Sequence, residues 1–295
     1  MRSMYKETKE IHHQILVRTL NPDDYDAWNA IAESAWGIEN INRPWDFTAL
    51  VKDNHVSVAL SDGDAVKGAS LNLLKIGNDG LPYLLVHMLA VHAHSQNDGL
   101  GKLLMDANYA LIREGKIAHT EIIKLTSDPM DSRNVRLYLH KCRMHANVYI
   151  PEAYKGLETE GGEKHLGLPA DRLYYQCCPS SPWVRQGIVP TQPDYARLVS
   201  IVPDVHSVSS QKPIILIETP ADLISLKNES SEKAVAWRMS QREQLSSLFN
   251  QGYTAVDHVM TRVNDVPRQH IVCLKGFNEH DPYCLIRAVQ KMEGI

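Results

Sequence analysis

The sequence predicts a mixed α/β (α+β) fold, in which helices flank a mostly antiparallel central sheet and a second, smaller α/β unit follows. Strand-like and helix-like segments alternate along the 295 residues. The turn-forming sequences SDGD and GNDG separate three consecutive strand-like runs, which favours antiparallel pairing. A proline-rich stretch over residues 179–213 interrupts this pattern and marks a change of unit.

These observations divide the chain into three predicted segments. Residues 1–180 form the main domain, and residues 181–212 form a proline-rich linker or cover. Residues 213–295 form the smaller α/β unit, which is too short for a complete independent enzyme. We expect its sheet to pack on the first sheet or to extend it.

The first elements are predicted from helix-start and turn signals. We expect a strand over 14–20 and a helix over 22–36, because Asn21 is a preferred N-cap residue and Pro22 suits the first helical position. A second helix is expected over 44–53. The three strands of the antiparallel run are expected over 55–61, 66–76 and 81–91.

The later elements follow from hydrophobic periodicity. An amphipathic helix is expected over 99–115, because leucines and alanines recur there with helical spacing. The remaining predictions are strands over 121–125, 146–150, 173–177, 214–218, 254–260 and 270–275, and helices over 132–142 and 231–249.

Composition excludes several classes of partner. The net charge of −4 and the scattered basic residues give no surface for nucleic acid. No apolar run approaches the roughly 20 residues of a spanning helix, and the start lacks the apolar core of a signal peptide. The five cysteines lack zinc spacing. We therefore expect a cytoplasmic protein with reduced thiols, no membrane partner and no metal.

The stretch SQNDGLGKLLM, residues 95–105, follows the apolar run LPYLLVHMLAV and opens the predicted helix. A helix that begins at a glycine turn presents free N–H groups and a positive dipole end, so it can bind phosphate. The alternative is a simple strand-to-helix turn with Asn97 and Asp98 as the N-cap. The spacing matches neither the dinucleotide motif GxGxxG nor the P-loop.

The spacing that does fit is Gln-x-x-Gly-x-Gly, at Gln96, Gly99 and Gly101. It resembles the pyrophosphate-binding motif of the GNAT superfamily of acyl-CoA-dependent N-acyltransferases. The order of predicted elements over about residues 14–178 is similar to the GNAT layout. The segments TSDPMDSRN, IPEAYKG, GLPADR and AWRMSQRE resemble a longer GNAT-like subgroup with a C-terminal extension. The resemblance implies a GNAT-like sheet and an acyl-CoA-binding catalytic domain over residues 1–180.

The resemblance also implies a cofactor site. Acetyl-CoA or another acyl-CoA, such as succinyl-CoA, would be the co-substrate, and Asn134 belongs to the implied site. The backbone amides implied to hold the pyrophosphate are those of Gln96, Asn97, Asp98, Gly99, Leu100 and Gly101. The end of the preceding strand, Leu89, Ala90 and Val91, would pair with the pantetheine arm, and a backbone N–H at Leu89 would polarise the thioester carbonyl.

Acyl transfer to an amine needs a base and an acid. His87 lies on the predicted strand two residues before Leu89, and so on the same face, and is the predicted base. The alternative is a strand histidine tucked against the core or the sheet edge. Tyr138 is the acid that the resemblance implies, although it suits aromatic packing equally well. Competing donors are Tyr154, Tyr174 and Tyr175.

Polar residues at strand and helix ends are the candidates for binding the acceptor. They are Asp128, Arg133, Asp171 and Arg172. An arginine among them could hold a carboxylate bidentately. The alternative is an internal salt-bridge network. Trp237 and Arg238 are predicted to supply packing and a surface charge.

We therefore expect an N-acyltransferase that moves an acetyl or another short acyl group directly to the amine of a small metabolite, an amino acid being one candidate. Direct transfer is expected because no cysteine lies at the glycine turn. Two alternatives keep the fold: a GNAT-like acyl-thioester decarboxylase and a non-catalytic acyl-CoA-binding module. A monomer and a homodimer both fit, since the chain's own C-terminal segment could cover an exposed sheet edge.

Overall fold

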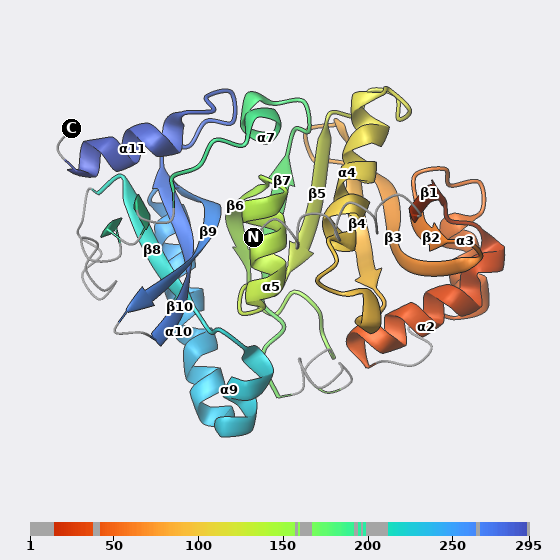
Figure 1. The fold of residues 1–295 in the computed structure, drawn as a ribbon, viewed down its shortest axis with the longest axis horizontal. Coiled ribbons are helices and arrows are strands. Elements are labelled where there is room, and N and C mark those ends of the chain that lie inside the picture. Colours follow the sequence, from red (N-terminus) through yellow and green to blue (C-terminus); the bar gives the residue numbers. More distant parts are fainter. Residues whose placement is uncertain are drawn as a thin grey trace, which may run out of the picture. The chain divides into compact units, whose positions relative to one another are not determined.

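The computed structural model describes residues 15–37, 42–156, 159, 167–191, 194, 195, 197, 198, 212–263 and 266–293. The chain forms two compact units (Figure 1). Unit 1 is Met1–Ile123 and unit 2 is Lys124–Ile295. The mixed α/β architecture predicted from the sequence, with a largely antiparallel sheet flanked by helices, is confirmed.

Unit 1 contains an antiparallel meander. Its strands are β1 (Ile15–Thr19), β2 (Val58–Asp62), β3 (Ala65–Ile76) and β4 (Pro82–Val91), which pair in that order. Gly63 and Gly80 lie in the two connecting turns with φ of 57° and 78°, a left-handed conformation that glycine adopts without strain. The predicted antiparallel run and its turns are thus confirmed, with β2 beginning three residues later than predicted.

Helices cover both faces of this meander. A 3₁₀ turn (Pro22–Asp24) leads into α2 (Tyr25–Trp36), and α3 (Pro44–Val51) follows. The predicted N-cap is confirmed, because the Asn21 side chain accepts a hydrogen bond from the Asp23 amide at 2.9 Å. One face of the sheet packs against α2 and α3, and the other packs against α4 (Leu100–Arg113).

Unit 2 contains the remaining strands. They are β5 (Ile122–Ser127), which begins at the unit boundary, β6 (His145–Ile150), β7 (Arg172–Cys177), β8 (Ile214–Thr219), β9 (Tyr253–Val263) and β10 (Val266–Lys275). Their order is β5-β7-β6-β9-β10-β8. Strand β9 pairs antiparallel with β6 at Ala146 and Ala255. The C-terminal strands therefore extend the sheet that carries β6 and β7.

The helices of unit 2 differ in part from the prediction. The helix predicted over 132–142 is a short α5 (Ser132–Val135) that continues as a π-helical turn (Arg136–Lys141). The predicted helix over 231–249 is α10 (Ser231–Asn250), capped by Ser230. The described residues also include helices that were not predicted, among them α7 (Pro182–Gln186), α9 (Leu223–Glu229) and α11 (Cys284–Glu293).

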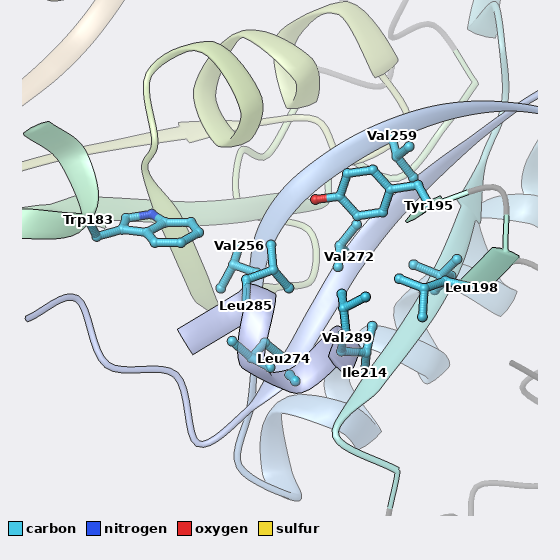
Figure 2. Close-up of a cluster of buried hydrophobic side chains, with 12 residues drawn as sticks. Trp183, Tyr195, Leu198, Ile214, Val256, Val259, Val272, Leu274, Leu285 and Val289 are labelled. Atoms are coloured by element: carbon cyan, nitrogen blue, oxygen red, sulfur yellow. The ribbon is translucent and has the colours of Figure 1, made fainter. Parts of the chain in front are cut away.

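The proline-rich segment contributes to the core of unit 2. Trp183, Tyr195 and Leu198 are buried beside apolar side chains of β8, β9, β10 and α11 (Figure 2). Trp183 and Leu198 have no exposed surface. These three residues act as core, which a flexible linker would not do. The predicted domain limits at 180 and 212 stay a prediction.

Candidate functional site

Strand β4 carries an extra residue in its middle. Val86 pairs with Asn72 and Met88 pairs with Leu71, so His87 has no partner residue in β3. Such a bulge bends the strand and re-aims the side chains beside it. The prediction that His87 and Leu89 share a face assumed that side chains alternate regularly along the strand, and the bulge interrupts this alternation. The catalytic role of His87 stays a prediction.

The His87 imidazole is suited to accept a proton. Part of its surface is exposed. Its pKa nevertheless lies below the ordinary histidine value, because the surrounding chain desolvates the ring and the Lys75 charge opposes protonation. The ring is therefore neutral at neutral pH, which is the form that a general base requires.

The chain between β4 and α4 forms a tight turn. After a 3₁₀ turn (Ala93–Ser95), Asn97 and Gly99 both adopt left-handed conformations, with φ of 73° and 84°. The Gln96 side chain donates to the Val91 carbonyl at 3.2 Å, which ties the turn to the end of β4. Gly99 is the N-cap of α4 and has no side-chain cap hydrogen bond. The alternative in which Asn97 and Asp98 cap this helix is wrong.

This turn presents free backbone donors. Within the described residues, the amides of Asn97, Asp98, Gly99, Leu100 and Gly101 have no hydrogen-bond acceptor, whereas the Gln96 amide donates to Ala93. Successive N–H groups in a turn with left-handed residues form a concave anion site, and the dipole of α4 adds positive potential there. The arrangement can hold a phosphate or pyrophosphate.

The tyrosine predicted as the acid lies in the core of unit 2. Tyr138 occupies the π-helical turn, and its ring centroid lies 5.3 Å from that of Tyr175. Burial, followed by the nearby Cys142 and Asp131, raises the pKa of Tyr138. These contacts give Tyr138 a packing role, and its role as an acid stays a prediction. Asn134, one turn earlier, donates to Asp131 at 2.9 Å.

The acceptor candidates Asp128, Asp171 and Arg172 belong to a buried polar network. Asp128 accepts from Arg238 at 2.6 Å, and its contact with Arg172 is 3.8 Å. Burial favours the neutral acid, but the Arg238 charge and the other contacts outweigh it, so the pKa of Asp128 lies below its usual value. Asp171 accepts two hydrogen bonds from Arg242. These three residues take part in ion pairs, as the salt-bridge alternative expects, while Arg133 is exposed. Acceptor binding by Asp128, Arg133 and Arg172 stays a prediction.

The prediction that Arg238 supplies a surface charge is wrong. Its side chain has no exposed surface. It lies on the buried stripe of α10 with Ala234, Gln241 and Leu245, at helical spacing. The signal was present in this spacing, but an arginine within an apolar stripe is ordinarily taken for an exposed residue.

A second buried network was not predicted. Asp257 in β9 accepts hydrogen bonds from Tyr195 and from the His258 amide, and it contacts His140 at 2.8 Å. Among the described residues, neither ring nitrogen of His258 has a hydrogen-bond partner, and burial lowers the pKa of His258 to about 3. The members lie far apart in sequence, so no local pattern joins them.

Neither a membrane-spanning helix nor a metal-binding cluster occurs among the described residues. In the described part of the chain, no helix combines the length and the apolar character needed to cross a bilayer. Nor do the described residues bring together three or more His, Cys, Asp or Glu side chains that could hold a metal ion.

The structure of this chain is similar to solved structures of several acetyltransferases. Arabidopsis thaliana Naa50, in complex with a bisubstrate analogue, is 13% identical over 56% of this chain and 98% of its own, with a TM-score of 0.44. A GNAT-family acetyltransferase from Streptococcus pneumoniae is 12% identical over the same shares, with a TM-score of 0.41. An aminoglycoside acetyltransferase from an uncultured soil sample is 17% identical over 43% and 87%, with a TM-score of 0.38.

No protein-family model and no curated protein matches the chain. At these identities and TM-scores, the similarity concerns the general arrangement of strands and helices and assigns no substrate and no site.

Proposed function

We propose that this chain is an acyl-CoA-dependent N-acyltransferase, which transfers an acetyl or another short acyl group directly to the amine of a small metabolite. The observation that carries the proposal is the row of free amides from Asn97 to Gly101, directly after a bulged strand. A CoA thioester offers a pyrophosphate to such amides and an extended pantetheine arm to the end of a strand.

In the proposed reaction, separate groups of the chain bind the CoA thioester, polarise its carbonyl and transfer protons. The amides of the turn bind the pyrophosphate, and Leu89, Ala90 and Val91 pair with the pantetheine arm. The Leu89 N–H donates to the thioester oxygen as negative charge develops on it. His87 accepts the proton of the attacking amine, the C–N bond forms, the C–S bond breaks, and Tyr138 donates a proton to the departing thiolate.

The cellular location, the partners and the oligomeric state are also part of the proposal. No disulfide is recorded for the five cysteines, all of which belong to the described residues, and this favours a reducing compartment and therefore the cytoplasm. The composition supports small-molecule partners rather than nucleic acid, and the chain would work as a monomer or a homodimer.

The glycine turn can be tested with a matched pair of substitutions. Gly99 and Gly115 lie at opposite ends of α4, with φ of 84° and 65°. An alanine at such a conformation is strained by about 1 to 2 kcal/mol. We expect Gly99→Ala and Gly115→Ala to lower stability alike. Only Gly99→Ala should weaken the binding of CoA, acetyl-CoA and succinyl-CoA in isothermal titration, because only it disturbs the free amides.

Two results would overturn the proposal. One is the absence of binding to all three thioester ligands, and the other is wild-type affinity in the Gly99→Ala variant. Product analysis after incubation with acyl-CoA and amines then separates the three chemistries. Acylated amine indicates transfer, loss of carbon dioxide from the acyl group indicates a decarboxylase, and binding without turnover indicates a non-catalytic module.

A further inference from the structure

The π-helical turn Arg136–Lys141 is an unusual element of unit 2. It closes with a hydrogen bond from the Cys142 amide to the Leu137 carbonyl at 2.9 Å, which spans five residues instead of the four of an α-helix. Such turns are rare and frequently occur at functional sites. This turn carries Tyr138, the predicted acid, so the contacts that fix the turn also fix Tyr138.

One side chain of the turn reaches another element. Among the described residues, His140 alone in the turn makes a side-chain hydrogen bond outside it, from Nδ1 to Asp257 Oδ1 at 2.8 Å. An ionised carboxylate only accepts, so Nδ1 carries the proton. Asp257 lies on β9, where its side chain has no exposed surface, and the His140 side chain is 25% exposed. This hydrogen bond joins the turn to the C-terminal strands.

The acceptor of that hydrogen bond is fixed by further contacts. Asp257 Oδ2 accepts from the Tyr195 hydroxyl, and Oδ1 accepts from the His258 amide at 2.8 Å. Arg143 Nη1 lies 3.7 Å from Oδ1 and supplies an opposite charge. Moving this carboxylate would leave a buried charge without its donors, which is costly. Asp257 is therefore a firm attachment point for His140.

The chain that leaves the turn is also held from the C-terminal side. Arg143 has φ of 56°, a left-handed conformation that is unfavourable for a residue with a side chain. Its Nη2 donates to the Gly187 carbonyl at 3.1 Å. Strained backbone persists only where surrounding contacts fix it. The polar contacts of His140 and Arg143 therefore both come from the chain beyond residue 180.

We propose that the hydrogen bond from His140 to Asp257 is the link by which the C-terminal strands hold the π-helical turn in place, which makes His140 a positioning residue for Tyr138. The C-terminal segment thus contributes to the reaction through the turn and not through a contact with substrate. The inference rests on the proposed function, since Tyr138 is the acid only there. Every contact that carries it lies within unit 2.

Cysteine labelling measures whether the turn is held. Cys142, directly after the turn, is 1% exposed, and Cys273 on β10 is 0% exposed. His140→Phe keeps a ring but removes the donor. We expect it to raise the rate of iodoacetamide labelling of Cys142 by about 10-fold or more, because a hydrogen bond to a charged group is lost. Labelling of Cys273, measured in the same sample by peptide mass spectrometry, should stay at the wild-type rate.

Two control variants separate the link from general destabilisation. Tyr195→Phe also costs Asp257 a hydrogen bond but leaves the one to His140 intact, so it should label Cys142 more slowly than His140→Phe does. His140→Asn keeps a side-chain N–H donor and should restore slow labelling. The inference is overturned if His140→Phe labels at the wild-type rate, or if either control labels as fast as His140→Phe. Faster labelling of Cys142 and Cys273 by the same factor also overturns it.

Kinetics test the consequence for Tyr138. His140→Phe should lower kcat by about 10-fold to 100-fold without changing KM for the acyl-CoA, since a misplaced catalytic group slows the chemical step. His140→Asn should restore kcat. In the Tyr138→Phe background, His140→Phe should lower kcat no further, because its effect passes through Tyr138. A further fall by the same factor, or a wild-type kcat in His140→Phe, overturns the positioning role.

Failure of the proposed function gives a different result. If no amine is acylated, the proposed reaction fails, and if Tyr138→Phe keeps the wild-type kcat, the acid assignment fails. In both cases the labelling of Cys142 still decides whether His140 and Asp257 hold the turn. Wild-type labelling in His140→Phe overturns the inference even where acyl transfer is found.

Discussion

Replacing Arg238 by methionine should destabilise the protein strongly, because it breaks a fully buried ion pair. Arg238 is 0% exposed and the Asp128 side chain is 4% exposed. Removing one partner of a buried pair ordinarily costs about 3 to 5 kcal/mol, since the other charge stays buried. Here Asp128 keeps the Met130 amide at 2.8 Å and Arg172 at 3.8 Å. We therefore expect a loss near the lower end of that range, about 3 kcal/mol.

Urea unfolding followed by tryptophan fluorescence measures this loss as a change in the free energy of unfolding. The matched control is Lys233→Met on the same helix, because Lys233 and Glu229 form an exposed pair with side chains 60% and 62% exposed. That control should change the free energy by less than about 1 kcal/mol. The double variant Asp128→Asn with Arg238→Met should lose less than the two single variants together. A loss below about 1 kcal/mol for Arg238→Met would refute the reasoning.

Three further predictions concern titrating groups. The pKa of buried His258 is about 3, below the unfolded value, so stability should fall by about 1.4 kcal/mol per pH unit between pH 6.5 and 3. His145 and His270, whose pKa values burial lowers to about 4, add slopes of the same sign, so His258→Leu should reduce the overall slope in urea midpoints by the His258 contribution; an unchanged slope would contradict the assignment. His87→Gln should keep CoA affinity but lose the fall in acyl transfer below pH 6.5; a wild-type pH profile would exclude His87 as the base. Tyr138→Phe should lower kcat by about 100-fold or more while its contact with Tyr175 persists, and an unchanged kcat would leave Tyr138 a packing residue.

The sequence predicted those parts of the structure that depend on local chemistry. Asn21 as N-cap, the glycine turns of the meander and the left-handed Gly99 follow from preferences of single residues. The bulge at His87 could not be predicted, because it depends on the register between two strands. Helix α11 was missed although Leu285, Ala288 and Val289 have helical spacing, since the preceding segment reads as irregular.

In the candidate site too, features that depend on neighbouring residues could be predicted from the sequence, and contacts between distant residues could not. The free amides of the turn follow from a short motif, whereas the networks around Asp128 and Asp257 join residues that are 110 and 117 positions apart. Asp128 lies before residue 180 and its nearest ion-pair partner, Arg238, lies after residue 212. Asp257 lies after residue 212 and contacts His140, before residue 180. Without the C-terminal strands and helices, Asp128 would lose Arg238 and His140 would lose Asp257. Because a buried charge without its partner is strongly destabilising, the C-terminal segment is an integral part of unit 2 rather than an addition to a complete domain.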